Sequence, residues 1–149
     1  HEYLGKLEDE YRKLLVGKIL VSTNDWGTGC FSCQFISDVV IVNDFRGTKE
    51  VKMYVQKFVI DPDHELVEKT EWWPLTQFND IPELNKDWHG YMLCDVETIL
   101  KPNGKTRTYL NECLDKYFKE IMSIVHEKVE NYIKDVRKEV KRISERNKK

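Results

Sequence analysis

The chain has 149 residues, of which 40% are hydrophobic, 11% aromatic and 34% charged, and its net charge at pH 7 is −2. This length suits one domain. The aromatic content excludes an intrinsically disordered chain, because such chains lack the large side chains whose burial offsets the entropy of ordering. The near-neutral total charge gives the whole molecule no strong electrostatic preference for a partner.

Apolar runs and cysteines indicate where the chain resides. The longest apolar run, residues 39–42, is far shorter than the roughly 18 residues that a membrane-spanning helix needs, so we expect no membrane association. The four cysteines do not indicate a disulfide-stapled secreted domain in a chain this large. We therefore expect reduced thiols and a cytoplasmic location. The start at His1 leaves processing, a trimmed tag or a fragment of a longer protein open.

Residues 3–15 predict a short N-terminal helix, because apolar residues recur there at spacings of three and four. Gly17 ends this helix as a C-cap glycine. The apolar face consists of Leu4, Leu7, Tyr11, Leu14 and Leu15.

Residues 18–109 predict a curled antiparallel sheet of about five to seven strands. Turn residues such as Asp61-Pro62-Asp63 and Pro102-Asn103-Gly104 separate apolar runs, as in β-hairpins. Residues 74–88 are irregular. The expected strands are residues 18–23, 30–36, 39–45, 51–60, 65–72 and 91–100, with Ser37 and Asp38 as a turn between the second and third.

The run 51–60 is apolar on both faces of the strand it predicts. A strand of this kind is covered on both sides, so we expect helix or a second layer on each face, or a partial barrel. Val51, Met53, Val55 and Val59 share one face, and Tyr54, Phe58 and Ile60 share the other.

The last third of the chain predicts one long amphipathic helix, residues 108–146, with Thr108 as its N-cap. Its apolar residues form a stripe whose pattern repeats every eleven residues. Eleven residues in three turns are 3.67 residues per turn, which keeps the stripe on one side of a nearly straight helix. A body of residues 1–107 is too small to cover this helix, so it should project from the body. We expect residues 108–149 to divide near Val125 into an inner half on the body and an outer half for assembly.

The outer half predicts a homodimer, because its narrow apolar stripe would otherwise face water. A different protein partner, fraying, or folding back onto residues 3–15 are the alternatives. The expected oligomer interface consists of Val129, Tyr132, Ile133, Val136, Val140 and Ile143.

The end of this helix is basic. Residues 137–149 contain seven basic and two acidic residues, so the segment carries +5 while the rest of the chain carries −7. Favourable interaction with the helix dipole explains cations at a helix C-terminus. The alternative is contact with phosphate or with an acidic partner.

Aromatic residues suggest a ligand site in the least regular part of the chain. Tryptophans in loops stack on bases, sugars or peptides, although they equally form a satellite core over a sheet. Basic residues on neighbouring turns, including Lys101 and Lys105, would receive a small anionic or nucleotide ligand. The candidate ligand-binding residues are Trp72, Trp73, Trp88, Tyr91, Trp26, Arg46 and Arg107.

No motif predicts a catalytic, metal or cofactor site. Cys30 and Cys33 have zinc-ligand spacing, but the second pair that a structural zinc site needs is missing. Asp87 and His89 have no identifiable nucleophile beside them. We therefore expect no metal and no cofactor.

Taken together, these patterns predict a non-catalytic binding protein that self-associates through its C-terminal helix. The alternative is a ligand-binding protein with a tryptophan-lined pocket for a nucleotide or nucleic acid, and an enzyme is the third possibility.

Overall fold

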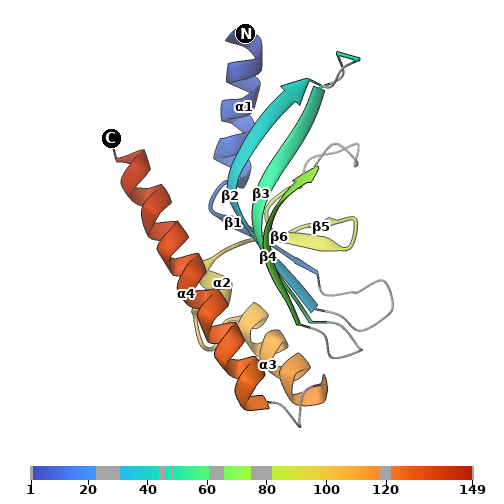
Figure 1. Cartoon of the computed structure of the whole chain (residues 1–149), viewed down its shortest axis with the longest axis vertical. Coiled ribbons are helices and arrows are strands. Elements are labelled where there is room, and N and C mark those ends of the chain that lie inside the picture. The colour runs from blue at the N-terminus through green and yellow to red at the C-terminus, as the bar shows by residue number, and fades with distance from the viewer. Residues whose placement is uncertain are drawn as a thin grey trace.

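The computed structural model describes residues 2–22, 31–43, 46–47, 49–60, 66–74, 82–117 and 122–148. These residues form an N-terminal helix, a six-stranded sheet and three later helices, which confirms the predicted α+β fold (Figure 1). The helices are α1 (Glu2–Leu15), α2 (Glu97–Leu100), α3 (Lys105–Tyr117) and α4 (Met122–Asn147). The strands are β1 (Lys18–Ser22), β2 (Phe31–Asn43), β3 (Lys49–Ile60), β4 (Leu66–Pro74), β5 (Asp87–Trp88) and β6 (Tyr91–Asp95).

The sheet is antiparallel throughout, with the strand order β4-β3-β2-β1-β6-β5. Six strands fall within the predicted range of five to seven. β4 and β5 are the outer strands of the described sheet, which is twisted and curved but not closed into a barrel (Figure 1). Because alternate side chains of a strand point to opposite faces, the two faces need separate covers.

Each face of the sheet is covered by helix. On the face that we call the α4 face, Phe35 and Phe58 pack in one core cluster with Leu114 of α3 and Val136 of α4. The opposite face, here called the α1 face, packs against Leu15 at the end of α1 in a second cluster (residues 20, 36, 39, 51, 53, 55, 88 and 93). The two apolar faces of residues 51–60 predicted helix or a second layer on each face, or a partial barrel, and the structure has helix on both faces.

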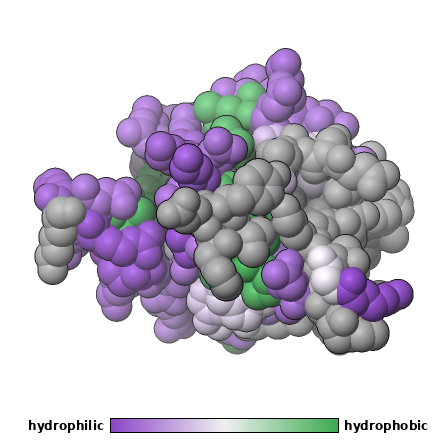
Figure 2. Space-filling view, turned by 90° about the horizontal axis from the view of Figure 1, so that it is seen from above, coloured by the Kyte–Doolittle hydropathy of each residue, from purple (hydrophilic) through white to green (hydrophobic). Residues whose placement is uncertain are grey.

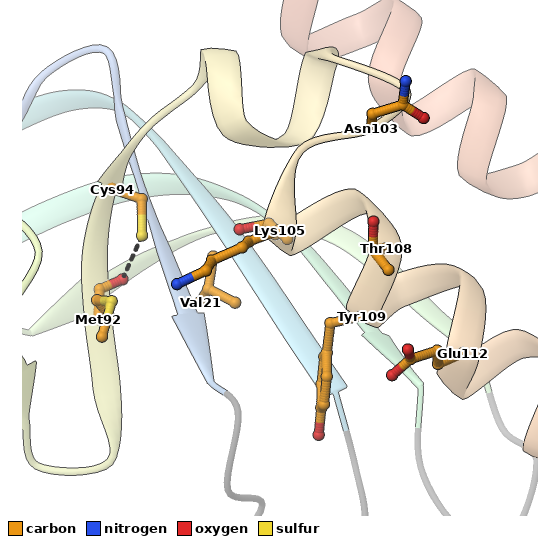
Figure 3. A pocket seen from close by; sticks show the side chains of 9 residues that line it. Val21, Met92, Cys94, Asn103, Lys105, Thr108, Tyr109 and Glu112 are labelled. Atoms are coloured by element: carbon orange, nitrogen blue, oxygen red, sulfur yellow. Dashed lines mark hydrogen bonds between the residues drawn. The ribbon is translucent and has the colours of Figure 1, made fainter.

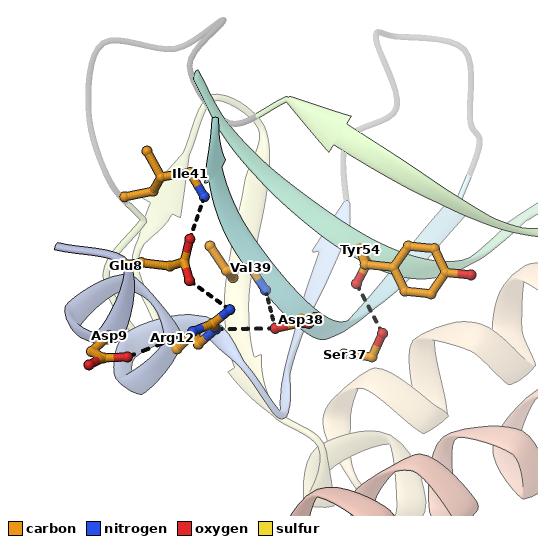
Figure 4. A network of polar contacts seen from close by, with 8 residues as sticks. All are labelled: Glu8, Asp9, Arg12, Ser37, Asp38, Val39, Ile41 and Tyr54. Atoms are coloured by element: carbon orange, nitrogen blue, oxygen red, sulfur yellow. Dashed lines mark hydrogen bonds and ion pairs between the residues drawn. The ribbon is translucent and has the colours of Figure 1, made fainter. Parts of the chain in front are cut away.

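A polar network ties α1 to the part of β2 that extends beyond β1 (Figure 4). β1 pairs with residues 32–35 of β2, and no described strand pairs with the later amides on that edge of β2. The Ile41 N–H donates to a carboxylate oxygen of Glu8 at 2.9 Å. Arg12 pairs with Glu8 at 2.8 Å and with Asp38 at 3.3 Å. Side chains of α1 thus satisfy a backbone amide that would otherwise be left on an open edge.

β2 is a single strand of 13 residues rather than the two strands expected around Ser37 and Asp38. The register with β3 shifts between Ile36 and Asp38, so Ser37 is an extra residue in a β-bulge. Its hydroxyl donates to the Tyr54 carbonyl at 3.2 Å. Because of the bulge, Ile36 and Val39 both belong to the cluster on the α1 face, although they are three residues apart.

The segment from Tyr91 to Thr108 also differs from its sequence prediction. The strand expected for residues 91–100 ends at Asp95, and α2 follows it. Pro102-Asn103-Gly104 joins two helices instead of closing a hairpin. α3 begins at Lys105, and the Thr108 amide already donates to the Gly104 carbonyl at 2.9 Å. Thr108 is therefore inside the helix, not its N-cap.

The C-terminal third is helical, as predicted, but it forms two helices that lie side by side as a hairpin (Figure 1). Arg107 of α3 and Glu130 of α4 form an ion pair across 23 residues of sequence. In one continuous helix these residues would lie about 35 Å apart. The chain therefore reverses direction between Tyr117 and Met122, and this observation corrects the single straight helix of residues 108–146.

The apolar stripe that was predicted to form the oligomer interface is covered by the chain's own sheet. Val129, Tyr132, Ile133, Val136 and Ile143 are each at most 7% exposed, and the half-buried Val140 packs against the same cluster. The Tyr132 ring packs on Phe58 with 5.2 Å between centroids, and its hydroxyl donates to the Gln56 carbonyl at 3.4 Å. The reason for expecting a second copy at this stripe is thereby removed, because the apolar surface needs no further cover.

The reversal between α3 and α4 has a simple energetic explanation. Closing a short loop within one chain costs little conformational entropy, whereas recruiting a second chain costs translational and rotational freedom. An apolar stripe that can reach its own sheet will therefore pack there.

No helix in the described part of the chain is long and apolar enough to cross a membrane.

Candidate ligand pocket

The two tryptophan side chains that the structure describes, Trp72 and Trp88, are not brought together. Trp72 lies on β4 and Trp88 on β5, the two outer strands of the sheet. Five strand spacings of about 4.8 Å separate these edges by about 24 Å. Trp88 is buried and packs near Tyr91, with 6.4 Å between ring centroids. Trp26 lies outside the described residues, and only the backbone of Trp73 is described.

The predicted basic residues are also dispersed. Arg46 is exposed in the turn between β2 and β3, whereas Arg107 is paired with Glu130. Lys101 pairs with Glu97 at 3.3 Å. Of the basic residues named from the sequence, Lys105 is the one that lines a described pocket.

The two cysteines with zinc-ligand spacing offer no described metal site. Cys30 lies outside the described residues, and Cys33 is buried in the core on the α4 face. Among the described residues, no group of three or more histidine, cysteine or acidic side chains is arranged to hold a metal ion.

A pocket of about 500 Å³ lies between strands β1 and β6 of the sheet and the first turns of α3 (Figure 3). Val21 and Cys94 form a buried apolar floor, and Met92 lines the side of β6. This volume lies within the usual range for small-molecule sites, which are mostly apolar with few polar groups.

The wall opposite the sheet comes from one face of α3. Lys105, Tyr109 and Glu112 recur at spacings of four and three, so all three side chains point to the same side of the helix. The side chain of Lys105 reaches from the start of α3 toward β6, while Tyr109 and Glu112 lie farther along the wall (Figure 3). Lys105 and Glu112 are seven residues apart, or about 10 Å along the helix axis. The pocket therefore has an apolar floor with a cation at one end and an anion at the other.

The one thiol in the pocket is held in its neutral form. Burial raises the pKa of the Cys94 thiol, and the negative charge of the neighbouring Asp95 raises that pKa further. The thiol donates a weak hydrogen bond to the Met92 carbonyl at 3.7 Å (Figure 3). Since the thiolate is the nucleophilic form of cysteine, Cys94 contributes an apolar surface at neutral pH.

Sequence reasoning missed most of this site. It placed Lys105 on a hairpin turn and began the helix at Thr108, so the shared face of Lys105, Tyr109 and Glu112 was not visible. Starting the helix directly after Gly104 would have revealed it. The contribution of Val21 and Cys94 depends on the pairing of β1 with β6, which no local pattern encodes.

Comparison of the chain with protein-family models, with curated proteins and with solved structures finds no match.

Proposed function

We propose that the protein is a non-catalytic binding protein that takes a small molecule with an apolar body and one anionic group in the pocket between α3 and strands β1 and β6. The observation that carries this proposal is the mainly apolar lining of a pocket of about 500 Å³, with Lys105 at one end. The first amides of α3 lie beside Lys105 and add a partial positive charge, which favours an anion there.

Binding suits this pocket better than nucleophilic catalysis. Its buried thiol favours the protonated form, because the pKa of Cys94 is raised. Its cation and anion stand at opposite ends of α3's first two turns, too far apart for a hydrogen bond between them. A cation and an anion placed in this way orient a ligand along the helix more readily than they transfer a proton within that ligand.

Octanoate and 1-octanol form a matched pair of probes for the pocket, since they differ in charge and share an apolar chain. Titration calorimetry should show octanoate binding about fivefold more tightly, as expected for a partly exposed ion pair worth about 1 kcal/mol. Lys105→Met should remove this preference, whereas the control Lys101→Met, outside the pocket, should retain it. Thr108→Trp should fill the mouth of the pocket and weaken both probes.

Failure of either probe to bind at millimolar concentration would contradict the proposal. Equal affinities of the wild type and Thr108→Trp would also contradict it, because they would place the bound probe elsewhere on the protein.

Self-association is a second candidate, now favoured at the edge strand β4 instead of α4. Trp72 is 46% exposed and stacks on Tyr54, with 4.9 Å between ring centroids. β4 has β3 on one side and no described strand on the other. Unpaired strand edges and exposed aromatic side chains are common in contacts between subunits.

Light scattering over a dilution series tests this candidate. We expect a wild-type dimer that Trp72→Glu converts to a monomer, because a carboxylate would be buried without a partner in the interface. Leu84→Glu, at an exposed apolar residue near the opposite edge of the sheet, should remain dimeric. A wild-type protein that is monomeric at every concentration contradicts the candidate.

A further inference from the structure

The outward face of α4 carries a row of basic side chains that we call the basic stripe: Lys134, Arg137, Lys138 and Lys141. With about 100° of rotation per residue, all four fall within a sector of about 100°. This sector is centred opposite the buried face of α4, which includes Val136 and Ile143. All four side chains are exposed.

The acidic residues of α4 leave the stripe unneutralised. Glu130 pairs with Arg107 of α3, and Glu139 pairs with Arg142 on the flank of the helix at 2.9 Å. In the described part of the chain, no member of the basic stripe takes part in an ion pair. Three acidic residues of α4 fall within the same sector, but they lie before Lys134 or after Lys141: Glu127, Glu130 and Glu145. The stripe is therefore a local concentration of positive charge on a chain whose total charge is −2.

The stripe is also straight and firmly held. From Lys134 to Lys141 it extends about 10 Å along the helix axis. Because the opposite face of α4 is packed on the sheet, the helix that carries these basic side chains is held in a fixed position. Hydrophilic residues dominate the C-terminal end of α4, which projects at the left of the space-filling view (Figure 2).

We infer that the basic stripe binds the phosphate backbone of a double-stranded nucleic acid without reading its sequence. Duplex DNA places phosphates at regular intervals along each strand, and neutralising them releases counterions. Basic residues once per turn on a straight helix match a row of charges of this kind. This binding uses a different surface from the pocket on α3 and does not depend on it.

Two other classes of partner fit the stripe less well. A helix that binds a membrane surface turns its apolar face to the lipid, but the apolar face of α4 is already buried against the sheet. Protein interfaces are depleted in lysine and rely on aromatic or aliphatic anchors. The sector of the stripe contains no exposed apolar residue.

Fluorescence anisotropy with a labelled 20-base-pair duplex tests the inference. If the stripe contacts four phosphates, the association constant should fall about 150-fold between 50 and 200 mM salt. The stripe variant, in which residues 134, 137, 138 and 141 are all replaced by glutamine, should lose most of the affinity and of the salt dependence. The control replaces Lys6, Lys86, Lys101 and Lys128, all exposed and outside the stripe, by glutamine.

The control has the same net charge as the stripe variant, so it separates the stripe from the total charge. Retention of wild-type affinity to within about threefold in the control supports the inference. Equal losses in both variants would overturn it, as would a wild type that does not bind the duplex at 50 mM salt. Binding to vesicles that contain phosphatidylserine, or to polyglutamate, without binding to the duplex would also overturn it and would point to a membrane or an acidic protein.

Discussion

Val136→Lys should unfold the protein rather than separate two copies of it. Val136 is fully buried in the core cluster between α4 and the sheet. A lysine there must either bury an unpaired ammonium group or push α4 away from the sheet. Both outcomes cost about 4 kcal/mol or more, which is a large part of the about 5–15 kcal/mol that stabilises an ordinary domain.

Circular dichroism melting curves and light scattering on the same samples measure the effect. Ser144→Lys introduces the same side chain at an exposed position of α4 and should melt within a few degrees of the wild type. A dimeric wild type with a well-folded, monomeric Val136→Lys would contradict the expectation. That result would return Val136 to an interface between copies.

Deletion of Ser37 should leave the protein folded, because the register of β2 with β3 needs no residue at this position. Ser37 is the extra residue of the bulge, and its two neighbours pair with consecutive residues of β3. Without Ser37, Ile36 and Val39 would be two residues apart, so both would still face α1. Ile41 would keep its partner on β3 and its hydrogen bond to Glu8.

The matched variant keeps the bulge and removes only its hydroxyl. Ser37→Ala loses the hydrogen bond to the Tyr54 carbonyl and should lower the free energy of unfolding by about 1 kcal/mol. Urea unfolding followed by tryptophan fluorescence compares the two variants. A deletion variant that does not fold would contradict the expectation and would show that the sheet needs the bend of the bulge itself.

Local patterns predicted the elements whose causes are local. The three- and four-residue spacing of leucines in residues 3–15 gave α1, and Gly17 after it has a φ of +85°, a left-handed conformation that glycine adopts without strain. The apolar pattern of residues 51–60 predicted β3 and a cover on both faces of the sheet, with helix as one of the alternatives. Each of these features depends on side chains a few residues apart.

Local patterns failed where two elements compete for the same residues. Ser37 and Asp38 have the composition of a turn, but pairing with β3 on one side keeps β2 continuous. Pro102-Asn103-Gly104 likewise favours a hairpin turn, yet it links α2 to α3. A Cβ at Gly104 would clash with the backbone carbonyl oxygen of Thr98, so a close contact between neighbouring segments requires glycine there.

The candidate pocket depended even more on tertiary structure. Its floor comes from β1 and β6, which are about 70 residues apart in sequence but adjacent in the sheet. Trp72 and Trp88 were predicted to line one site, but the same strand order places them on β4 and β5 at opposite edges of the described sheet. Proximity in sequence predicts proximity in space only within one element or one hairpin.

For the C-terminal third, the sequence by itself determined that an amphipathic helical segment carries an apolar stripe that must be covered, and that its far end is basic. Only the tertiary structure decided what covers the stripe. Hydrophobic burial has no direction and depends on the area removed from water, so a stripe specifies how much surface must be buried and not which surface buries it. The reversal between α3 and α4 brings the stripe onto the chain's own sheet and leaves the basic side chains facing outward.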